Sequence, residues 1–405
     1  MHVLDTCKSC AIGLLFLIST AARHASRHHK LRRRLLQLFL LTLFIWSTAD
    51  VLLAYRRFNE EQVHIDYKPP ERQRIYIASI QWDAKRVLSK HWNNAVVELA
   101  DVVGPENVYV TVYESGGSTG TKEALRELDK ALNEVGVRHS IIISDTTSED
   151  ATWMTPVGGK HTTYLTRLHN EALRPLYDLR DAGTFFDRIL FLGDAVFTKD
   201  DVLSLLNTNY GAYTAACSFD ILNPPSYLDV SALRDADGYE IIMQKWPFFR
   251  AAESRDALKS MLPVHVRSCW GQMVFMHTGA FYLTRPIRFR EVAEGLAAKG
   301  LEASERCLIH ADNSLSRRRG VYLNPFVRIG DNDREHAAAH SNIHWLSTWE
   351  LFASIWENRL RRWSTPPFLQ GWPLYFRLSA WEAENEKNKE PGDWCLTFGP
   401  QSTAT

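Results

Sequence analysis

The sequence predicts an α/β protein: one membrane-spanning helix, then a mostly parallel central sheet with helices on both faces. Three observations predict this. A single apolar run near the N-terminus is long enough to cross a bilayer, strand-like and helix-like runs alternate from residue 74 onward, and 45% of the 405 residues are hydrophobic. Alternating strands and helices are joined by right-handed crossovers, which make the strands parallel. The length allows one large domain or two ordinary ones.

Residues 1–34 form a basic cytosolic tail, and residues 35–55 are the candidate transmembrane signal anchor. The tail ends in RHASRHHKLRRR, and two arginines follow the apolar run. About 20 residues at ~1.5 Å rise cover the ~30 Å hydrocarbon layer. Because basic residues stay in the cytosol, the rest of the chain is predicted to be luminal, as in a single-pass type II protein. A cleaved signal peptide at residues 11–22 and a buried core helix at 35–55 are the alternatives.

A short polar stem, residues 56–73, leads to the predicted α/β domain, residues 74–330. Runs rich in β-branched and aromatic residues predict strands, and 3.6-residue apolar periods predict the helices between them. The predicted strands are residues 74–81, 107–114, 137–144, 189–192, 211–221, 271–283 and 320–329, and the clearest helices are residues 121–136 and 162–183.

Residues 331–405 differ in character and form a C-terminal Trp-rich extension. Residues 344–363 have the pattern of an amphipathic helix, and the segment after them contains Pro, Gly and aromatic residues without a clear period. An apolar stripe of this kind either docks on the domain or faces a membrane.

Charge and cysteine content restrict the partners and the compartment. Lys plus Arg and Asp plus Glu number 47 each, so no net field argues for nucleic acid. Cys217, Cys269, Cys307 and Cys395 fall in the predicted luminal part, where disulfides form. Four cysteines allow three pairings, and the sequence does not choose among them or exclude four buried thiols.

The strand at residues 189–192 stops at Gly193 and Asp194. An ionised carboxylate beside a core is costly unless a cation or a hydrogen-bond donor faces it. Ligands of parallel sheets bind at the carboxyl ends of the strands, where Asp194 lies. We therefore predict that Mn²⁺ or Mg²⁺ faces Asp194, since these ions prefer oxygen ligands. The alternative is that Asp194 caps the next helix.

A second strand ends in ESGGSTG, a glycine-rich turn that begins with Glu114 and Ser115. Such a turn can hold a phosphate on its backbone N–H groups, although a plain turn is the alternative. A strand ending in a carboxylate, within a luminal α/β domain, is the arrangement of a GT-A glycosyltransferase. There a metal bridges the phosphates of a sugar nucleotide. The usual pair is Asp-x-Asp, whereas Asp200 and Asp201 are more typical of a helix N-terminus.

A series of blocks in residues 74–330 carries a more specific resemblance. The blocks follow one another in this order: YIASIQW, VYVTVYESG with TKEALRELD, RILFLGDAVFTKDDVLSLL, SYLDVSALRDADG, SCWGQMVF, SERCLIHAD and NPFVRI. In this order they resemble the fungal capsule-associated α-1,3-mannosyltransferases, glycosyltransferase family 69. The resemblance implies a GT-A-like fold, GDP-mannose as donor, a glycan or polysaccharide precursor as acceptor, and an α-1,3-linked product formed with retention. It also implies a Golgi membrane protein whose catalytic domain is luminal.

The family blocks fall on residues that the resemblance makes site candidates. Asp194 would bind the metal, and Asp235, Glu305 and Asp312 are the candidate catalytic carboxylates. The candidate donor or substrate residues are Glu114, Ser115, Asn170, Asp229, Arg234 and Trp270.

The chain also departs from the family pattern at four positions. Gly193 and Gly271 stand where the family usually has Asn, Gln272 where it usually has Gly, and His169 where it usually has Arg. The alternative function is therefore a catalytically weak relative that acts as a binding or assembly partner in glycan or capsule synthesis.

Overall fold

The computed structural model describes residues 29–59, 73–143, 160–222, 226–227, 231–340 and 347–399. It divides into two compact units, Met1–Arg56 and Arg57–Thr405. Helix α2 (His29–Asn59), most of which belongs to the first unit, contains a stretch, Arg32–Arg57, that is long and apolar enough to cross a membrane. The predicted N-terminal apolar helix is thus present.

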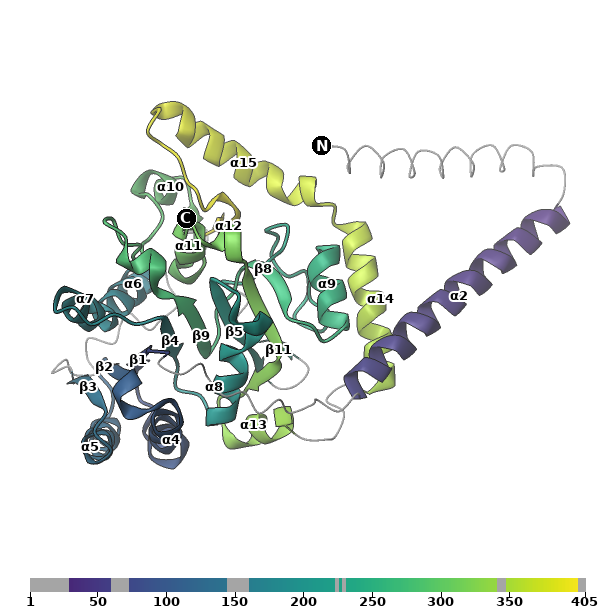
Figure 1. The fold of residues 1–405 in the computed structure, drawn as a ribbon. Coiled ribbons are helices and arrows are strands. Elements are labelled where there is room, and N and C mark those ends of the chain that lie inside the picture. The colour runs from purple at the N-terminus through teal and green to yellow at the C-terminus, as the bar shows by residue number, and fades with distance from the viewer. Residues whose placement is uncertain are drawn as a thin grey trace. The chain divides into compact units, whose positions relative to one another are not determined.

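The second unit is built on one large mixed sheet (Figure 1). Its strand order is β3-β2-β1-β4-β9-β5-β11-β8-β7, and β6 pairs with β5 off this path. β9 and β8 run antiparallel to their neighbours, whereas the other strands on the path all point the same way. The predicted α/β class with a mostly parallel sheet is confirmed. The strands are β1 (Ile75–Gln81), β2 (Val108–Glu114), β3 (Arg138–Ile143), β4 (Arg188–Leu192), β5 (Ala215–Leu222), β6 (Ser226–Tyr227), β7 (Arg234–Asp235), β8 (Val264–Ser268), β9 (Met273–His277) and β11 (Val321–Ile329), with β10 (Leu301–Glu302) and β12 (Thr397–Phe398) forming a separate pair.

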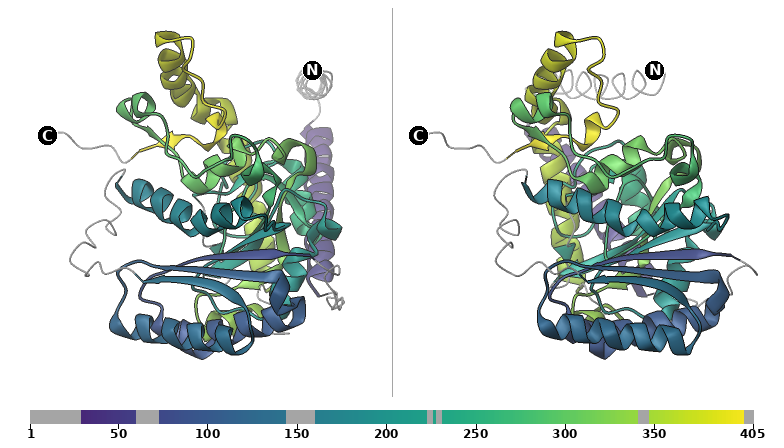
Figure 2. Two further views of the ribbon diagram at one scale, coloured as in Figure 1. Left: turned by 60° about the vertical axis from the view of Figure 1, so that its left-hand side comes forward. Right: turned by 90° about the vertical axis from the view of Figure 1, so that its left-hand side faces the viewer.

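Helices cover both faces of the β1–β4 half of the sheet. Figure 2 shows α4 and α5 on one face and α6 and α7 on the other. The helices of this unit are α3 (Lys85–Val87), α4 (Asn93–Val103), α5 (Thr119–Glu134), α6 (Lys160–Ala172), α7 (Arg174–Asp181), α8 (Lys199–Leu206), α9 (Ala252–Lys259), α10 (Glu294–Ala298), α11 (Glu305–Asp312), α12 (Ser316–Arg319), α13 (Asp333–His340), α14 (Thr348–Ser364) and α15 (Pro367–Glu384). The described residues also form a π-helical turn at Leu88–Trp92 and short 3₁₀ turns at Pro105–Asn107, Thr208–Gly211, Thr278–Tyr282 and Asp393–Cys395.

The sequence pattern explains why these elements pack as they do. On α5, the residues Ala124, Leu125, Leu128 and Leu132 recur at helical spacing, and all four are buried. Burying a leucine side chain contributes about 1.5–3 kcal/mol. The strands they cover are apolar on both faces, which is typical of the buried interior of a largely parallel sheet. The carboxyl ends of these strands are thereby held rigidly at one edge.

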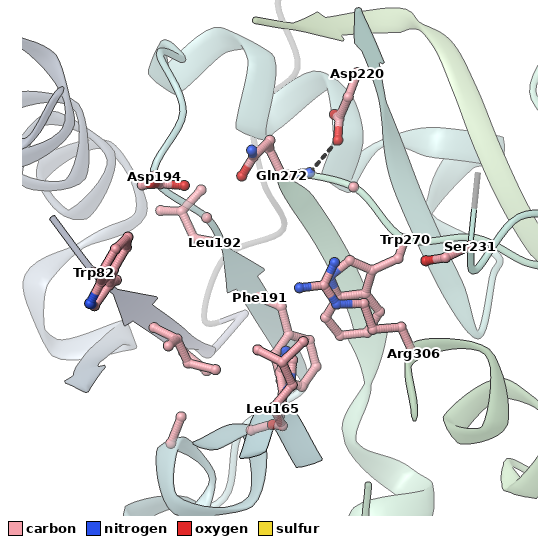
Figure 3. Close-up of a pocket in the computed structure, with 16 residues that line it drawn as sticks. Trp82, Leu165, Phe191, Leu192, Asp194, Asp220, Ser231, Trp270, Gln272 and Arg306 are labelled. Carbon is pink, nitrogen blue, oxygen red and sulfur yellow. Dashed lines mark hydrogen bonds between the residues drawn. The ribbon is translucent and has the colours of Figure 1, made fainter. Parts of the chain in front are cut away.

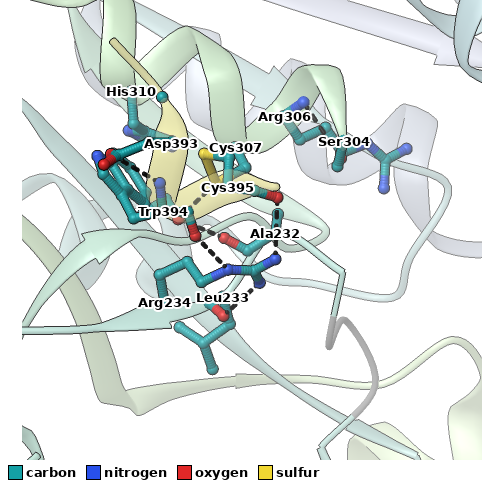
Figure 4. The surroundings of a disulfide bond; sticks show 12 residues. Ala232, Leu233, Arg234, Ser304, Arg306, Cys307, His310, Asp393, Trp394 and Cys395 are labelled. Atoms are coloured by element: carbon teal, nitrogen blue, oxygen red, sulfur yellow. Dashed lines mark hydrogen bonds between the residues drawn. A yellow bond between two sulfur atoms is a disulfide. The ribbon is translucent and has the colours of Figure 1, made fainter. Parts of the chain in front are cut away.

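Two disulfides link segments of the half of the unit that contains β5, β8 and α11. Cys217 on β5 is bonded to Cys269, which follows β8, and Cys307 on α11 is bonded to Cys395 near the C-terminus. This is one of the three pairings that the sequence allowed. The second bond holds the C-terminal segment against α11 (Figure 4). The constraint limits the freedom of the unfolded chain and so favours the folded state.

Part of the C-terminal extension packs on the same unit. Leu378 and Trp381 of α15 are buried in a cluster that includes Leu296, Leu308 and Leu396. On the same helix Trp372, Tyr375 and Phe376 are exposed. One stripe of this helix, which lies in the segment without a clear sequence period, therefore docks on the domain.

Candidate functional site

A cavity of about 450 Å³ lies at the carboxyl ends of β1 and β4 (Figure 3). This is the edge of the sheet where ligands of α/β proteins bind. Figure 3 shows Asp194, Gln272 and Asp220 on one side of the cavity, and Phe191, Trp270 and Arg306 on another. The lining residues are Ala78, Ile80, Trp82, Leu165, His169, Ala172, Phe191, Leu192, Gly193, Asp194, Asp220, Ser231, Trp270, Gly271, Gln272 and Arg306.

The backbone before Asp194 is held from two sides. The Trp92 indole N–H donates to the Gly193 carbonyl at 2.8 Å, and the Gly193 N–H donates to the Gln272 carbonyl at 2.7 Å. The Asp194 side chain is exposed to the cavity, yet the protein around it removes enough water to raise the pKa of this carboxyl above its ordinary value. Asp194 therefore follows a firmly held backbone segment, and its surroundings disfavour the negative charge of the carboxylate.

Asp194 does not cap the next helix. The cap of α8 is Thr198, whose hydroxyl accepts from the Asp201 N–H at 3.2 Å while the Asp201 carboxylate accepts from the Thr198 N–H at 2.8 Å. The capping alternative for Asp194 is wrong, and the expectation that Asp200 and Asp201 belong to a helix N-terminus is confirmed.

Two further carboxylates near Asp194 were missed by the sequence reasoning. Asp220 on β5 accepts from the Gln272 N–H and from the Ser218 hydroxyl, each at 2.6 Å. Asp331, just after β11, accepts from the Gln272 side-chain amide at 2.9 Å. Burial raises the pKa of Asp331, and the negative charge of Asp194 adds to the effect. Both follow apolar strand segments, which is the only local signal in the sequence.

The wall opposite Asp194 is aromatic. Trp270 packs against Phe191 with ring centroids 5.1 Å apart, and His169 meets Trp270 edge-on at 5.3 Å. Burial, and then the charge of Arg306, lower the pKa of His169 to about 3, so this imidazole is neutral. The Arg306 guanidinium lies 5.7 Å from the centroid of the Trp270 ring. The wall thus combines a flat apolar face with one positive charge.

Glu305 is the one predicted catalytic carboxylate near this wall. It is buried, with its Oε1 3.4 Å from Arg306 Nε and 3.8 Å from His169 Nδ1. It is the first residue of α11, where a carboxylate is favoured by the helix dipole.

The side chains of the glycine-rich turn and of Asn170 are hydrogen-bonded to other groups of the protein. The buried Glu114 carboxylate accepts from the Gly117 N–H, which closes the turn, and the Ser115 hydroxyl bonds to the Tyr164 hydroxyl. Asn170 donates to the Phe289 carbonyl at 2.9 Å and accepts from the Phe289 N–H at 3.1 Å. That pair of bonds fixes Phe289, whose ring stacks on His169 at 4.5 Å.

Arg234, Asp235 and Asp312 lie outside the cavity lining. Arg234 is buried, and its guanidinium donates to the carbonyls of Trp394 at 3.0 Å and Cys395 at 3.2 Å (Figure 4). The Asp235 carboxylate accepts from three backbone N–H groups, those of Asp237, Tyr239 and Ala251. Asp312 binds Arg290 through two bonds, at 2.6 and 2.9 Å. Asp229 lies outside the described residues.

The residues around Asp194 can contribute only part of a metal site. Among the described residues, no group of three or more His, Cys, Asp or Glu side chains could hold a metal ion. The side-chain oxygens that line the cavity near Asp194 belong to the carboxylates of Asp194 and Asp220 and to the amide of Gln272, and oxygen ligands of both kinds suit Mn²⁺ or Mg²⁺. The donor set therefore fits a cation whose remaining ligands are water or phosphate oxygens.

Comparison with known proteins gives one family match. A family model described as Cryptococcal mannosyltransferase 1 matches residues 74–312. No curated protein matches the sequence significantly.

Several solved structures are distantly similar. The mannosyltransferase PcManGT from Pyrobaculum calidifontis, in complex with GDP-Man and Mn²⁺, is 12% identical with a TM-score of 0.39, and the match covers 87% of each chain. S. aureus TarS (1–349) is 10% identical with a TM-score of 0.36, covering 74% of each chain. GalNAc-T7 with UDP, GalNAc and Mn²⁺ is 12% identical with a TM-score of 0.36, covering 64% of this chain and 43% of that one.

Proposed function

This chain belongs to the Cryptococcal mannosyltransferase 1 family and is therefore a glycosyltransferase, and on that premise we propose that it moves mannose from GDP-mannose to a glycan or polysaccharide precursor. The linkage that we propose is α-1,3, formed with retention of the anomeric configuration. One observation carries the proposal: Asp194 opens into a cavity at the carboxyl ends of the central strands, opposite an aromatic wall that holds Arg306.

Each of several residues in or beside the cavity has a different proposed role in binding the donor. A cation at Asp194, Mn²⁺ or Mg²⁺, supplies positive charge to the diphosphate when bound. Arg306 supplies a second positive charge from the opposite wall, where it stabilises charge that develops on the leaving group. Trp270 is largely buried but lines the cavity, where the exposed part of its ring would contact the sugar. Asn170 and Phe289 keep His169 in place behind that ring.

Of the predicted carboxylates, Glu305 is the one we retain for the reaction centre. It lies beside Arg306 and His169, next to the wall that would face the sugar. We propose that Arg234, Asp235 and Asp312 are stabilising residues. They do not line the cavity, and their side chains bond to backbone groups, to Glu240 or to Arg290.

We propose that the enzyme is a single-pass type II protein of the Golgi membrane with a luminal catalytic unit. The apolar stretch in α2, the basic tail before it and two disulfides in the catalytic unit all support this location. Disulfides persist in the secretory lumen and are rare in the cytosol.

The second candidate is a catalytically weak relative that binds donor or acceptor without turning them over. The replacement of Asn by Gly at residues 193 and 271, relative to the family pattern, favours it. An assay of donor turnover distinguishes the two candidate functions.

The test is donor turnover by the full-length protein in detergent. GDP-mannose, other GDP-sugars and UDP-sugars are supplied in turn with Mn²⁺, and release of the nucleoside diphosphate is measured with and without mannoside acceptors. We expect GDP release from GDP-mannose, accelerated by an α-mannoside acceptor. Tight GDP-mannose binding without turnover, for every acceptor tried, would support the weak relative instead.

A further inference from the structure

We propose that Gln272 supplies a second protein oxygen, its side-chain carbonyl Oε1, to the cation held by Asp194. The proposal rests on the proposed function and names the residue that takes the place of a second carboxylate in this chain.

Three hydrogen bonds fix Gln272 in one orientation. Its backbone N–H donates to Asp220 at 2.6 Å, and its backbone carbonyl accepts from the Gly193 N–H at 2.7 Å. Its side-chain Nε2 donates to Asp331 at 2.9 Å. A carboxylate only accepts hydrogen bonds, so Asp331 binds the nitrogen of the amide and turns the oxygen the other way.

The oxygen is turned toward Asp194. A Cβ atom built on Gly193 would overlap Gln272 Oε1, so the amide oxygen lies directly against the backbone that precedes Asp194. Figure 3 shows this oxygen on the side of Gln272 that faces the Asp194 side chain. Only glycine at residue 193 leaves room for this arrangement.

The two facing groups are both acceptors. The backbone N–H of Asp194 itself interacts with its carboxylate, and among the residues that the structure describes no other donor to this carboxylate or to Gln272 Oε1 is found. Two acceptors aimed at one another repel, and a hydrogen bond or a cation between them removes the repulsion. A divalent cation fits best, because Mn²⁺ and Mg²⁺ accept both carboxylate and amide oxygens.

The ligand charges also explain how such a site would behave. One carboxylate and one neutral amide neutralise only half of the charge of a divalent cation, so the ion binds weakly until a diphosphate adds its oxygens. Cation binding would therefore be coupled to donor binding. The competing explanation is that Gln272 only fills the space above Gly193 and links Asp220 to Asp331.

The experiment measures Mn²⁺ binding to the full-length protein in detergent, by the electron paramagnetic resonance signal of free Mn²⁺. It is done with Mn²⁺ alone and with GDP, corrected for the Mn²⁺ that GDP binds without protein. Gln272→Met keeps the length of the side chain but removes the oxygen, whereas Gln272→Glu keeps the oxygen and adds a charge. Asp194→Asn reports on the site itself, and Asp200→Asn is the matched control on α8.

With GDP present, we expect Gln272→Met to weaken Mn²⁺ binding roughly tenfold. Without GDP, Gln272→Glu should strengthen it several-fold, and Asp200→Asn should change nothing. Wild-type Mn²⁺ affinity in both Gln272 variants, with affinity lost in Asp194→Asn, would overturn the role of Gln272 and leave the proposed function standing. Unchanged affinity in Asp194→Asn would instead refute the metal site itself.

A second variant covers the case in which Gln272→Met fails to fold. Gly193→Ala keeps the amide but displaces it, because the new Cβ overlaps Oε1, the end of a flexible side chain. Weakened Mn²⁺ binding in Gly193→Ala supports the proposal, and unchanged binding contradicts it.

Discussion

Arg234→Ala should destabilise the catalytic unit and leave donor binding nearly unchanged. The Arg234 guanidinium donates to the carbonyls of Trp394 and Cys395, which lie 160 and 161 residues further along the chain. Those two carbonyls lose their donor in the variant, at about 1–3 kcal/mol each, which gives a loss of roughly 2–6 kcal/mol. Arg234 does not line the cavity, so the affinity for GDP-mannose should hold.

The loss is measurable as a fall in the thermal midpoint. For a unit of about 350 residues, an unfolding entropy of about 2.1 cal/mol/K per residue converts it into a shift of roughly 3–8 °C. The assay is thermal unfolding followed by circular dichroism, with GDP-mannose affinity measured on the same sample. Arg267→Ala is the matched control, because Arg267 is exposed and lies over the Trp394 ring at 5.9 Å. Lost donor affinity in Arg234→Ala, at an unchanged midpoint, would refute the reasoning and return Arg234 to the donor site.

Three further predictions concern pH, redox state and topology. Burial lowers the pKa of His310 from 6.5 to about 4, so on acidification the unfolded chain binds a proton at this histidine before the folded protein does. The free energy of unfolding should therefore be highest above about pH 6.5 and decrease toward pH 4. His310→Gln should reduce this dependence of stability on pH. Replacing both Cys307 and Cys395 by Ser should cost about 2–5 kcal/mol in unfolding measurements, and an unchanged midpoint would argue against this pairing. A C-terminal tag should resist protease in sealed microsomes until detergent is added, and its digestion in intact vesicles would contradict the luminal assignment.

The fold was predictable where its signals are local. The strand-like run at residues 74–81 and the helical period at 121–136 correspond to β1 (Ile75–Gln81) and α5 (Thr119–Glu134). The run at 271–283 is shorter in the structure, where β9 ends at His277 and a 3₁₀ turn follows. The direction of β9, antiparallel between β4 and β5, was not predictable because the run itself is equally compatible with either direction.

The same distinction, between local sequence signals and the arrangement of distant strands, applies to the residues of the candidate site. Asp194 and Trp270 were found because each lies in a recognisable block, and both line the cavity. Asp220 and Asp331 were missed because they reach the site only through the order of the strands, which brings β5 and β11 beside β9 and β4.

The charged, glycine-ended segment at residues 234–238 is a case in which the sequence named candidate residues that do not line the cavity. The family resemblance made Arg234 and Asp235 site candidates, and in the structure both side chains are buried and bonded mainly to backbone groups. A charged residue in a sequence does not reveal whether its partner is a ligand or the backbone of a distant segment. Here the partner segment of Arg234 is the C-terminal one, held in place by a disulfide.

The most direct test of the central claim is mannosyl transfer from GDP-mannose by Asp194→Asn, measured across a range of Mn²⁺ concentrations. The substitution keeps the size of the side chain and removes its charge, and Asp200→Asn, at the second residue of α8, is the control. We expect Asp194→Asn to fold with a wild-type thermal midpoint, to lose most transfer, and to lose the dependence of GDP binding on Mn²⁺. Near-normal transfer that Mn²⁺ still stimulates would contradict the account.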